Sequence, residues 1–458
     1  MQANSLAYDP RDRDSILAYA ERLVGNSLRE ILDELPPTID FSSHKGGFGT
    51  ALERHYFGYE PNSRPVPDFA EAGIELKATP LKTVRKKLVA KERLVLGMID
   101  YMAIDSEEWE SSTFIKKNSH LLLVFYLHEA DTDPRDFVVR IVRLWDFPAE
   151  DLEIIRQDWE KIVAKVREGK AHELSEGDTL YLGACTKSSD STKRRSQPRS
   201  PEPAKPRAFS LKASYMNTII DDSLARQEAH GREIVIDPRP IRSVAAADLL
   251  AGLSFEEAIA NLFAPYIGLT ADEIAERLGV TAKRGAKNYY AVLTNRMLGF
   301  EAKERVAEFE KADIQVKTMR LTTSGRPKED ISFPAFKYID LVEQEWDTSD
   351  LKDALSKRFF FVIYQLDRDG TPTLVGTRFW TMPVSDVERL ARRCFDETQH
   401  RIREDRAEYL PKKSENRAVH VRPHGRDSAD VIATPSGRLV CRKSFWLNGT
   451  YIKEQLGL

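Results

Sequence analysis

The chain has 458 residues, of which 41% are hydrophobic and 31% charged, so it holds enough apolar material for packed cores and is neither disordered nor fibrous. Its 69 Lys and Arg residues nearly balance 72 Asp and Glu residues, which excludes a uniformly basic nucleic-acid coat and makes any polyanion site local. Three widely spaced cysteines (Cys185, Cys394 and Cys441) fit neither a disulfide framework nor a CxxC zinc site. We therefore expect a cytoplasmic protein without a membrane partner, because no apolar run approaches the roughly 18 residues that span a bilayer.

Two helices are predicted before residue 60. The first is amphipathic, with apolar residues at helical spacing between Ile16 and Leu32. The second follows the glycine-rich segment 45–49 and carries Glu53 one turn in. Glycines at the start of a helix allow a phosphate to approach the backbone closely, although such a segment is more often a flexible turn.

The pattern D-x6-E-x-K is formed by Asp68, Glu75 and Lys77. On a strand, Glu75 and Lys77 project to one face while their apolar neighbours project into the core, and a turn around Gly73 would return Asp68 to the side of Glu75. Two carboxylates at one spot predict a site for Mg²⁺, an ion that can polarise a phosphodiester and supply a hydroxide. Lys77 would orient the water or offset the developing charge. The alternative is an ordinary surface Glu–Lys pair, since the pattern arises by chance in roughly one such chain in ten.

Two basic stretches follow this pattern in the first half of the chain. Residues 77–93 contain seven Lys or Arg and one acid, and residues 187–212 contain eight Lys or Arg, two acids and four prolines. The second stretch is typical of a long exposed loop, in which we expect Lys187 and Arg207 to contact DNA phosphates. A solvated linker is the alternative reading of this loop.

Buried strands are predicted at 121–127 and 359–364, where short apolar runs are rich in aromatic residues. Each run is followed by the motif R-x-W-x-x-P and then by an amphipathic helix.

The chain contains one large repeat. Five blocks recur in the same order at a spacing of 235 to 241 residues: 49–58 with 290–299, 68–81 with 308–321, 120–127 with 358–365, 143–148 with 378–383, and 209–216 with 445–452. Duplication of one unit explains this, so we predict an α/β (α+β) protein with a domain at 1–225, a linker at 226–244 and a second domain at 245–458. Each domain would be a mixed sheet flanked by helices. The repeat also explains a superficial helix-turn-helix pattern at 269–298, whose second helix is the partner of the helix carrying Glu53.

A family resemblance is carried by the segments KGGFGTALERHYFG, PDFAEAGIELKATP, KERLVLGMIDY, SSTFIKKN, GKAHELSEG, CTK and RAFSLKASYM. They resemble the MutH and Sau-type restriction endonucleases, and the tandem arrangement is similar to the two-domain staphylococcal members of that family. The resemblance implies a PD-(D/E)xK nuclease fold in each half, and Mg²⁺-dependent cleavage of double-stranded DNA at GATC.

The resemblance also implies roles for single residues. The metal-binding acids of the family fall on Asp68 and Glu75, the catalytic lysine on Lys77, and the supporting helix carboxylate on Glu53. A DNA-contacting lysine falls on Lys45. A further lysine of the active site matches Lys117, with Lys116 beside it as the alternative register. The recognition loop begins at Cys185-Thr186-Lys187, where MutH has Arg-Pro in place of the first two residues.

The second half differs at these positions. The repeat replaces Glu53 by Thr294, Asp68 by Glu308 and Glu75 by Gln315, and keeps only the lysine, as Lys317. With one of two anionic ligands gone, Mg²⁺ should bind poorly there. The pair Arg422-Pro423, followed by His424 and Arg426, resembles the MutH recognition loop, so we predict that this half binds DNA without cutting it.

These observations favour a type II restriction endonuclease whose second half is an allosteric effector domain, with one DNA site bound in each half. We expect a monomer in solution, and a dimer or looped complex on DNA as further states. Two alternatives remain: a MutH-like repair nickase, and a non-catalytic DNA-binding regulator in which Asp68, Glu75 and Lys77 form a salt-bridge cluster.

Overall fold

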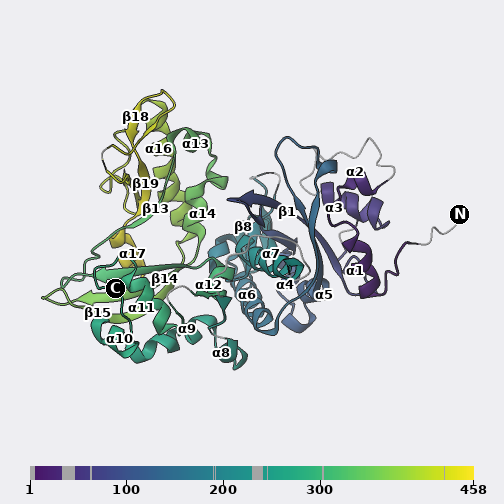
Figure 1. Cartoon of the computed structure of the whole chain (residues 1–458), viewed down its shortest axis with the longest axis horizontal. Helices are drawn as coiled ribbons and strands as arrows, with labels where there is room; N and C mark the ends of the chain where they lie inside the picture. Colours follow the sequence, from purple (N-terminus) through teal and green to yellow (C-terminus); the bar gives the residue numbers. More distant parts are fainter. Residues whose placement is uncertain are drawn as a thin grey trace. The chain divides into compact units, whose positions relative to one another are not determined.

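The computed structural model describes residues 6–32, 47–61, 64–188, 190, 192–228, 241–244, 246–301, 304–427 and 429–458. The chain forms two compact units (Figure 1). Unit 1 comprises Met1–Leu174, Thr179–Pro238 and Glu310–Ala312, and unit 2 comprises Ser175–Asp178, Arg239–Phe309 and Asp313–Leu458. The predicted linker, 226–244, falls largely on residues outside the described ones, and its limits stay a prediction.

Unit 1 combines short helices with two sheets and one long helix. Its helices are α1 (Arg13–Glu21), α2 (Leu28–Ile31), α3 (Gly47–Ala51), the π-helical turn η1 (Leu52–Tyr56), α4 (Tyr101–Ile104), η2 (Trp109–Ser111), α5 (Thr113–Asn118), η3 (Pro134–Asp136), α6 (Ala149–Arg167), η4 (Ala171–Glu173) and α7 (Ala213–Glu228). Its strands are β1 (Glu75–Val84), β2 (Lys87–Ala90), β3 (Leu94–Met98), β4 (His120–Leu127), β5 (Val139–Asp146), β6 (Leu182–Thr186), β7 (Arg195–Gln197), β8 (Ser200–Ala204) and β9 (Arg207–Leu211).

The main sheet of unit 1 has the order β2-β1-β4-β5, with β1 and β4 parallel and the other pairs antiparallel. A second sheet has the order β3-β9-β6, and β7 and β8 form a hairpin. Leu122 and Val124 of β4 are fully buried among apolar residues. Leu76 of β1 and Ile74, the residue just before β1, are buried in the same cluster. The start of β1 is therefore held firmly against β4, and this is where the acidic pattern lies.

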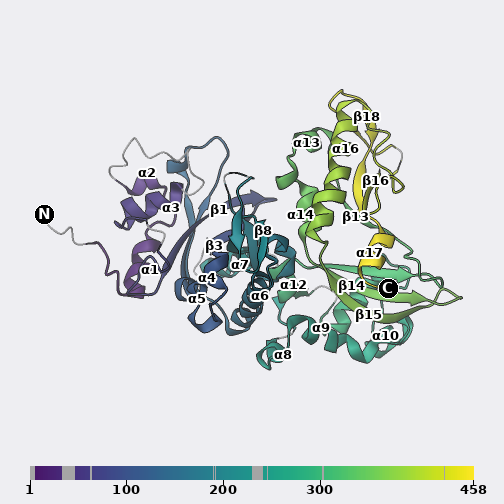
Figure 2. The same ribbon diagram turned by 180° about the vertical axis from the view of Figure 1, so that it is seen from behind.

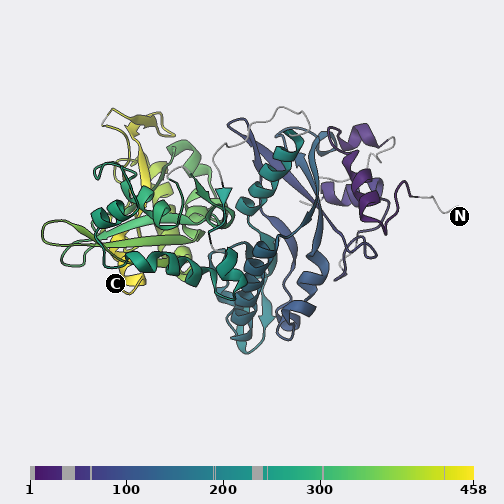
Figure 3. The ribbon, with the colours of Figure 1, turned by 60° about the horizontal axis from the view of Figure 1, so that its bottom comes forward.

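Aromatic residues pack the N-terminal helices against the turn that carries Glu53. The rings of Tyr19 and Tyr56 stack at 4.5 Å, Phe57 meets Phe69 edge-on at 5.4 Å, and the hydroxyl of Tyr8 donates to the carbonyl of Phe57 at 2.8 Å. Figure 3 shows these helices, in purple, beside the blue strands of unit 1. In Figures 1 and 2, α3 lies next to β1. This packing places η1 over the first residues of β1.

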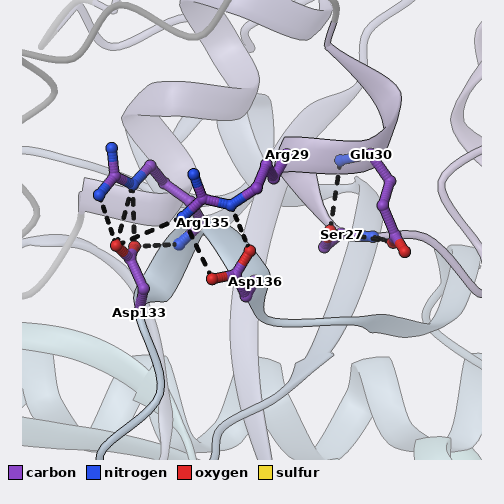
Figure 4. A network of polar contacts seen from close by, with 6 residues as sticks. All are labelled: Ser27, Arg29, Glu30, Asp133, Arg135 and Asp136. Atoms are coloured by element: carbon purple, nitrogen blue, oxygen red, sulfur yellow. Dashed lines mark hydrogen bonds and ion pairs between the residues drawn. The ribbon is translucent and has the colours of Figure 1, made fainter.

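The predicted helix near the start of the chain is two helices, α1 and α2. Gly25 has a φ of +89°, a left-handed conformation that ends the first helix, and Ser27 starts the second with a capping box closed by Glu30. Figure 4 shows that α2 is tied to η3 by Arg29, whose guanidinium pairs with Asp136 at 2.5 Å. This exposed ion pair holds α2 to the segment that joins β4 and β5.

The helix α6 supports the second sheet of unit 1 through one buried carboxylate. The side chain of Asp158 is fully buried and accepts hydrogen bonds from the backbone N–H groups of Leu180, Tyr181 and Leu182 at 2.8, 2.6 and 2.9 Å. Three donors compensate a buried charge that would otherwise be very unfavourable. Asp158 thus fixes where β6 begins, and with it the loop that follows β6.

Unit 2 has the same kinds of element. Its helices are η5 (Glu176–Asp178), α8 (Ala246–Leu250), α9 (Phe255–Phe263), η6 (Ala264–Tyr266), α10 (Ala271–Arg277), α11 (Tyr289–Met297), α12 (Ala307–Ala312), α13 (Tyr338–Glu343), η7 (Trp346–Thr348), α14 (Asp350–Ser356), α15 (Val384–Asp386), the π-helical turn η8 (Val387–Ala391), α16 (Arg392–Arg403) and α17 (Gly449–Gln455). Its strands are β10 (Ile241–Arg242), β11 (Arg305–Val306), β12 (Gln315–Leu321), β13 (Ile331–Ala335), β14 (Phe359–Leu366), β15 (Pro372–Trp380), β16 (Val419–Pro423), β17 (Val431–Ala433), β18 (Leu439–Cys441) and β19 (Lys443–Leu447). The last residues of α12 are those assigned to unit 1.

The sheets of unit 2 follow those of unit 1 in register. The order β12-β14-β15 corresponds to β1-β4-β5, and β13-β19-β16 corresponds to β3-β9-β6. Glu75 lies opposite Leu121, and its repeat partner Gln315 lies opposite Phe359. Both units also join a tyrosine to an aspartate near the start of the helix after R-x-W-x-x-P: Tyr215 donates to Asp151 at 3.0 Å and Tyr451 to Asp386 at 2.7 Å.

The predicted fold class is confirmed: each unit has mixed strands flanked by helices. The predicted strands are β4 and β14, and the helices predicted after R-x-W-x-x-P are α6 and the stretch from α15 to α16. The helix-turn-helix reading of 269–298 fails, because 11 residues, 278–288, separate α10 from α11 instead of a tight turn. Among the described helices, none is both long enough and apolar enough to cross a bilayer.

Candidate active site

A short hairpin returns Asp68 to the start of β1. Phe69 and Ile74 form an antiparallel bridge, with N···O distances of 2.9 and 3.2 Å in the two directions. Gly73, in the turn, has a φ of +70°, a conformation that glycine adopts without the strain of a side chain. The predicted turn around Gly73 is therefore present, and the residues before and after it lie side by side.

Two hydrogen bonds lock Asp68 and Glu75 together. The backbone N–H of Asp68 donates to Oε2 of Glu75 at 3.2 Å, and the N–H of Leu76 donates to Oδ2 of Asp68 at 3.0 Å. Glu75 is only 1% exposed. Each carboxylate is thus held by the backbone of the segment that carries the other, which gives the pair a defined geometry.

Two lysines neutralise the buried carboxylate of Glu75. Nζ of Lys77 lies 2.5 Å from Oε1 of Glu75, and Nζ of Lys117, at the end of α5, lies 3.4 Å from the same oxygen. Lys117 also donates to the carbonyl of Arg64 at 3.2 Å. Lys116 is exposed, so of the two registers considered for this lysine the structure places Lys117 at the site.

Glu53 is the third carboxyl group of the cluster. Burial, together with the charge of Asp68, raises its pKa to about 7. Burial, together with the charge of Glu75, raises the pKa of Asp68 to about 6. Both shifts have the same cause: negative groups share a poorly hydrated place, and each disfavours the ionised form of the next. The structure therefore brings together all five predicted catalytic residues.

The donor set of this cluster fits a hard divalent cation. A cation between Asp68 and Glu75 would relieve the repulsion that raises the pKa of Asp68, and Mg²⁺ typically uses one or two carboxylates plus waters and substrate phosphate. The described residues contain no preformed group of three or more His, Cys, Asp or Glu side chains placed to hold an ion. Among the described residues, the carboxylates placed closest together at this site are the pair Asp68 and Glu75.

The predicted DNA-contacting residues of unit 1 differ in how far their side chains are exposed. Lys187 is exposed and lines a hollow of about 240 Å³, together with Lys193, Arg194 and Arg195. Arg207 is 7% exposed, and its guanidinium donates to the carbonyl of Ala184 at 2.5 Å. Its charge is directed into the sheet, so as described it is not on a DNA-binding surface. Lys45 lies outside the described residues.

In unit 2, Arg422 and His424 meet around one tryptophan. The guanidinium carbon of Arg422 lies 3.5 Å from the ring centroid of Trp446, and the ring of His424 lies 5.2 Å from it. Arg422 also pairs with Asp330 at 3.5 Å. Arg426 is exposed and donates its backbone N–H to Asp430. These residues form a cationic and aromatic surface at the end of β16.

The strand register supports the match between Cys185-Thr186 and Arg422-Pro423. Leu182 of β6 lies opposite Leu211 of β9, and its counterpart Val419 of β16 lies opposite Leu447 of β19. Three residues further along β6 and β16, Cys185 and Arg422 therefore occupy equivalent positions. The loop of unit 1 has a small thiol where unit 2 has a cation stacked on a ring.

Some residues at these sites were not among those predicted from the sequence. Tyr59 is one: its ring packs on Phe69 at 5.4 Å, its N–H donates to the carbonyl of Glu53, and its hydroxyl is buried without a hydrogen-bond partner among the described residues. Burial and the charge of Asp68 raise the pKa of this phenol well above its usual value. Trp446 is another, and comparison with its repeat partner Ser210 would have singled it out as a difference between the halves.

Comparisons with known proteins match the segment that forms most of this cluster. Residues 57–158, which include four of the five clustered residues, match the family described as DNA mismatch repair enzyme MutH. The type II restriction enzyme Sau3AI of Staphylococcus aureus is 33% identical over an alignment of 489 residues that covers 95% of this chain and 96% of that protein. The MutH proteins of Shewanella woodyi and Vibrio campbellii are 27% and 26% identical, covering 46% of this chain and 93% and 94% of their own lengths.

Proposed function

The chain belongs to the family of the type II restriction enzyme Sau3AI, and from this premise we propose that it is a Mg²⁺-dependent type II endonuclease that cuts double-stranded DNA at GATC. The observation that carries the proposal is the convergence of Asp68, Glu75 and Lys77 in unit 1. A match to a restriction enzyme over nearly the full length favours this function over a MutH-like nickase, whose relatives cover only 46% of the chain.

The proposed reaction is hydrolysis of one phosphodiester bond in each strand. Water attacks phosphorus, the bond from phosphorus to the 3′ oxygen breaks, and the products carry 5′-phosphate and 3′-hydroxyl ends. Asp68 and Glu75 would hold the Mg²⁺ ion, which when bound polarises the phosphate and lowers the pKa of water. Carboxylate oxygens locked by backbone N–H groups, as here, need little rearrangement to accept an ion.

Two lysines and Glu53 have further roles beside the pair of metal-binding carboxylates. Lys77 and Lys117 are positioned to stabilise negative charge that develops on the phosphate oxygens, because their ammonium groups share one small, poorly hydrated region. The carboxyl group of Glu53, with a pKa of about 7, is suited to exchange a proton with water near neutral pH. The cations around the hollow at Lys187 would neutralise DNA phosphates and position the duplex.

Digestion of unmethylated plasmid with Mg²⁺ tests the function. We expect discrete linear fragments whose sequenced ends lie at GATC; nicked circles would indicate a repair nickase, and intact plasmid a DNA-binding regulator. Asp68→Ala and Glu75→Ala should abolish cleavage while specific DNA binding remains. Normal cutting by either variant would contradict the metal assignment.

The two adjacent lysines of α5 provide a matched pair of variants. Lys117→Ala removes an ammonium group that lies 3.4 Å from Glu75, and we expect the cleavage rate to fall by at least about 100-fold. Lys116→Ala removes an exposed charge one residue away and should change the rate by less than about threefold. Equal effects of the two variants would remove Lys117 from the active site.

We also propose that unit 2 binds a second DNA site and acts as an effector. Support comes from the surface formed by Arg422, His424 and Trp446, and from the replacement of Glu75 by the uncharged Gln315. An uncleavable GATC duplex added to a slow single-site substrate should raise the rate of cleavage. If the rate stays unchanged at every concentration of duplex, unit 2 serves only packing.

A further inference from the structure

Lys317 occupies in unit 2 the position that Lys77 occupies in unit 1. Lys77 is the third residue of β1 and lies opposite Leu123 of the parallel strand β4. Lys317 is the third residue of β12 and lies opposite Phe361 of the parallel strand β14. The same strand pairing therefore presents a lysine at the same place in both units.

The two lysines differ in their partners. Lys77 pairs with Glu75 at 2.5 Å. Within the part of the chain that the structure describes, Lys317 makes no ion pair and no hydrogen bond. Gln315, which replaces Glu75, is uncharged, and its amide donates to Asp313 at 2.9 Å. Unit 2 has thus kept the cation and lost its counter-charge.

Two acids that precede Lys317 in the chain, Glu308 and Asp313, are engaged elsewhere. Glu308, the counterpart of Asp68, is 4% exposed and accepts from the hydroxyl of Ser243 at 2.6 Å and from the N–H of Val244 at 3.1 Å. Asp313, which replaces Gly73 in the turn, pairs with Lys357 at 2.8 Å. The paired carboxylates that would attract a metal ion are therefore absent at this place.

Burial without a counter-charge is unfavourable for an ammonium group. The pKa of Lys317 is lowered, and burial is the cause. An anion beside Nζ would restore the charged form and stabilise the site. Thr294, the counterpart of Glu53, is 1% exposed and its hydroxyl has no partner among the described residues, so a neutral group stands where unit 1 has an acid.

We propose that unit 2 binds a phosphodiester group of DNA directly on Lys317, without a metal ion. In unit 1 a cation must stand between carboxylates and phosphate. In unit 2 Gln315 replaces one carboxylate, and the other, Glu308, is bound to Ser243 and Val244. The phosphate itself therefore supplies the missing negative charge. The inference rests on the proposed DNA binding of unit 2 and names the contact that would replace the metal.

Acetylation of lysines with the N-hydroxysuccinimide ester of acetic acid, followed by mass spectrometry, tests the contact in the full chain. The reaction is run in EDTA, with and without a 20-base-pair duplex that contains one GATC. We expect the duplex to slow the labelling of Lys317 at least about threefold. Lys337, whose side chain is 72% exposed, is the reference lysine in the same unit and should label at an unchanged rate.

Binding of the same duplex in EDTA at several salt concentrations provides a second readout. Lys317→Gln should weaken binding and lower the slope of log K against log salt by about one, as expected for one lost phosphate contact. Lys317→Arg should retain the slope, and Lys337→Gln should match the wild type.

The outcomes separate this contact from the function itself. Unchanged labelling and an unchanged slope for Lys317→Gln would overturn the contact, and so would protection or binding that requires a divalent ion. Cleavage of plasmid by the wild-type chain with Mg²⁺ would leave the nuclease function standing in either case. Failure of that cleavage would contradict the proposed function independently of Lys317.

Discussion

Replacing Asp68 by Asn should stop cleavage and yet stabilise the metal-free protein. Asp68 is half-buried beside Glu75, and burial with that charge raises its pKa from 3.8 to about 6. The side-chain oxygen of Asn can still accept the hydrogen bond from the N–H of Leu76, which is 3.0 Å long in the wild type. The substitution therefore removes a repelled charge and keeps its main contact.

The size of the effect follows from the pKa. A rise of about 2 pKa units corresponds to about 3 kcal/mol at a pH where the carboxylate is ionised. The amide is itself polar and is buried with one of its groups unpaired, so we expect a net gain of about 1 to 2 kcal/mol in the free energy of unfolding. For a domain of about 200 residues this raises Tm by about 2 to 8 °C.

The raised pKa of Asp68 determines how the stability of the folded protein changes with pH. Because the folded-state pKa of Asp68 lies above its unfolded value, the folded wild type binds more protons between about pH 4 and pH 6. The contribution of Asp68 to the stability of the wild type is therefore lost as the pH rises through this window, and Asp68→Asn lacks this contribution. The difference in Tm between variant and wild type should be absent at pH 4 and complete above pH 7.

Thermal unfolding of both full-length proteins in EDTA, followed by circular dichroism from pH 4 to 8, measures this difference. With added Mg²⁺ the wild type should gain stability and the variant should gain little, because one ligand has become neutral. A Tm for Asp68→Asn that equals or falls below the wild-type value at pH 8 would refute the idea that burial and the charge of Glu75 make the ionised form of Asp68 unfavourable.

Other substitutions and conditions probe the rest of the structure. Asp158→Ala leaves three buried N–H groups without an acceptor and should lower the free energy of unfolding by about 3 kcal/mol or more in a urea titration; a loss below 1 kcal/mol would contradict its role. Arg29→Ala removes an exposed ion pair and should cost less than about 1 kcal/mol in the same titration. Gly73→Ala forces a side chain into a left-handed turn at φ +70°, so we expect about 1 kcal/mol of destabilisation and a lower cleavage rate. The Mg²⁺ concentration for half-maximal cleavage should rise as the pH falls from 8 to 6, since protons compete with the ion for Asp68, whose pKa is about 6, and neutralise Glu53 beside it, whose pKa is about 7; a constant value would argue against Asp68 as a ligand.

Local patterns were sufficient for the elements that hold the site. The apolar runs of β4 and β14, the helix after each R-x-W-x-x-P motif and the spacing of Asp68, Glu75 and Lys77 are properties of adjacent residues, and periodicity of 2 or 3.6 reports them directly. The turn at Gly73 is likewise determined by adjacent residues. It was predictable because a positive φ is a property of one residue and its neighbours.

Contacts between distant segments depended on packing. The choice of Lys117 over Lys116, the burial of Arg207 against Ala184 and the stacking of Arg422 on Trp446 all join residues that lie on different elements. From the residues alone, each half was predicted to have its own core, a mixed sheet and a lysine at the matching position of the repeat, Lys77 or Lys317. The packed structure was needed to show that Lys117 also reaches Glu75, and that Glu308 and Asp313 bind groups other than Lys317. These contacts join segments that lie far apart in the chain, so no local spacing encodes them.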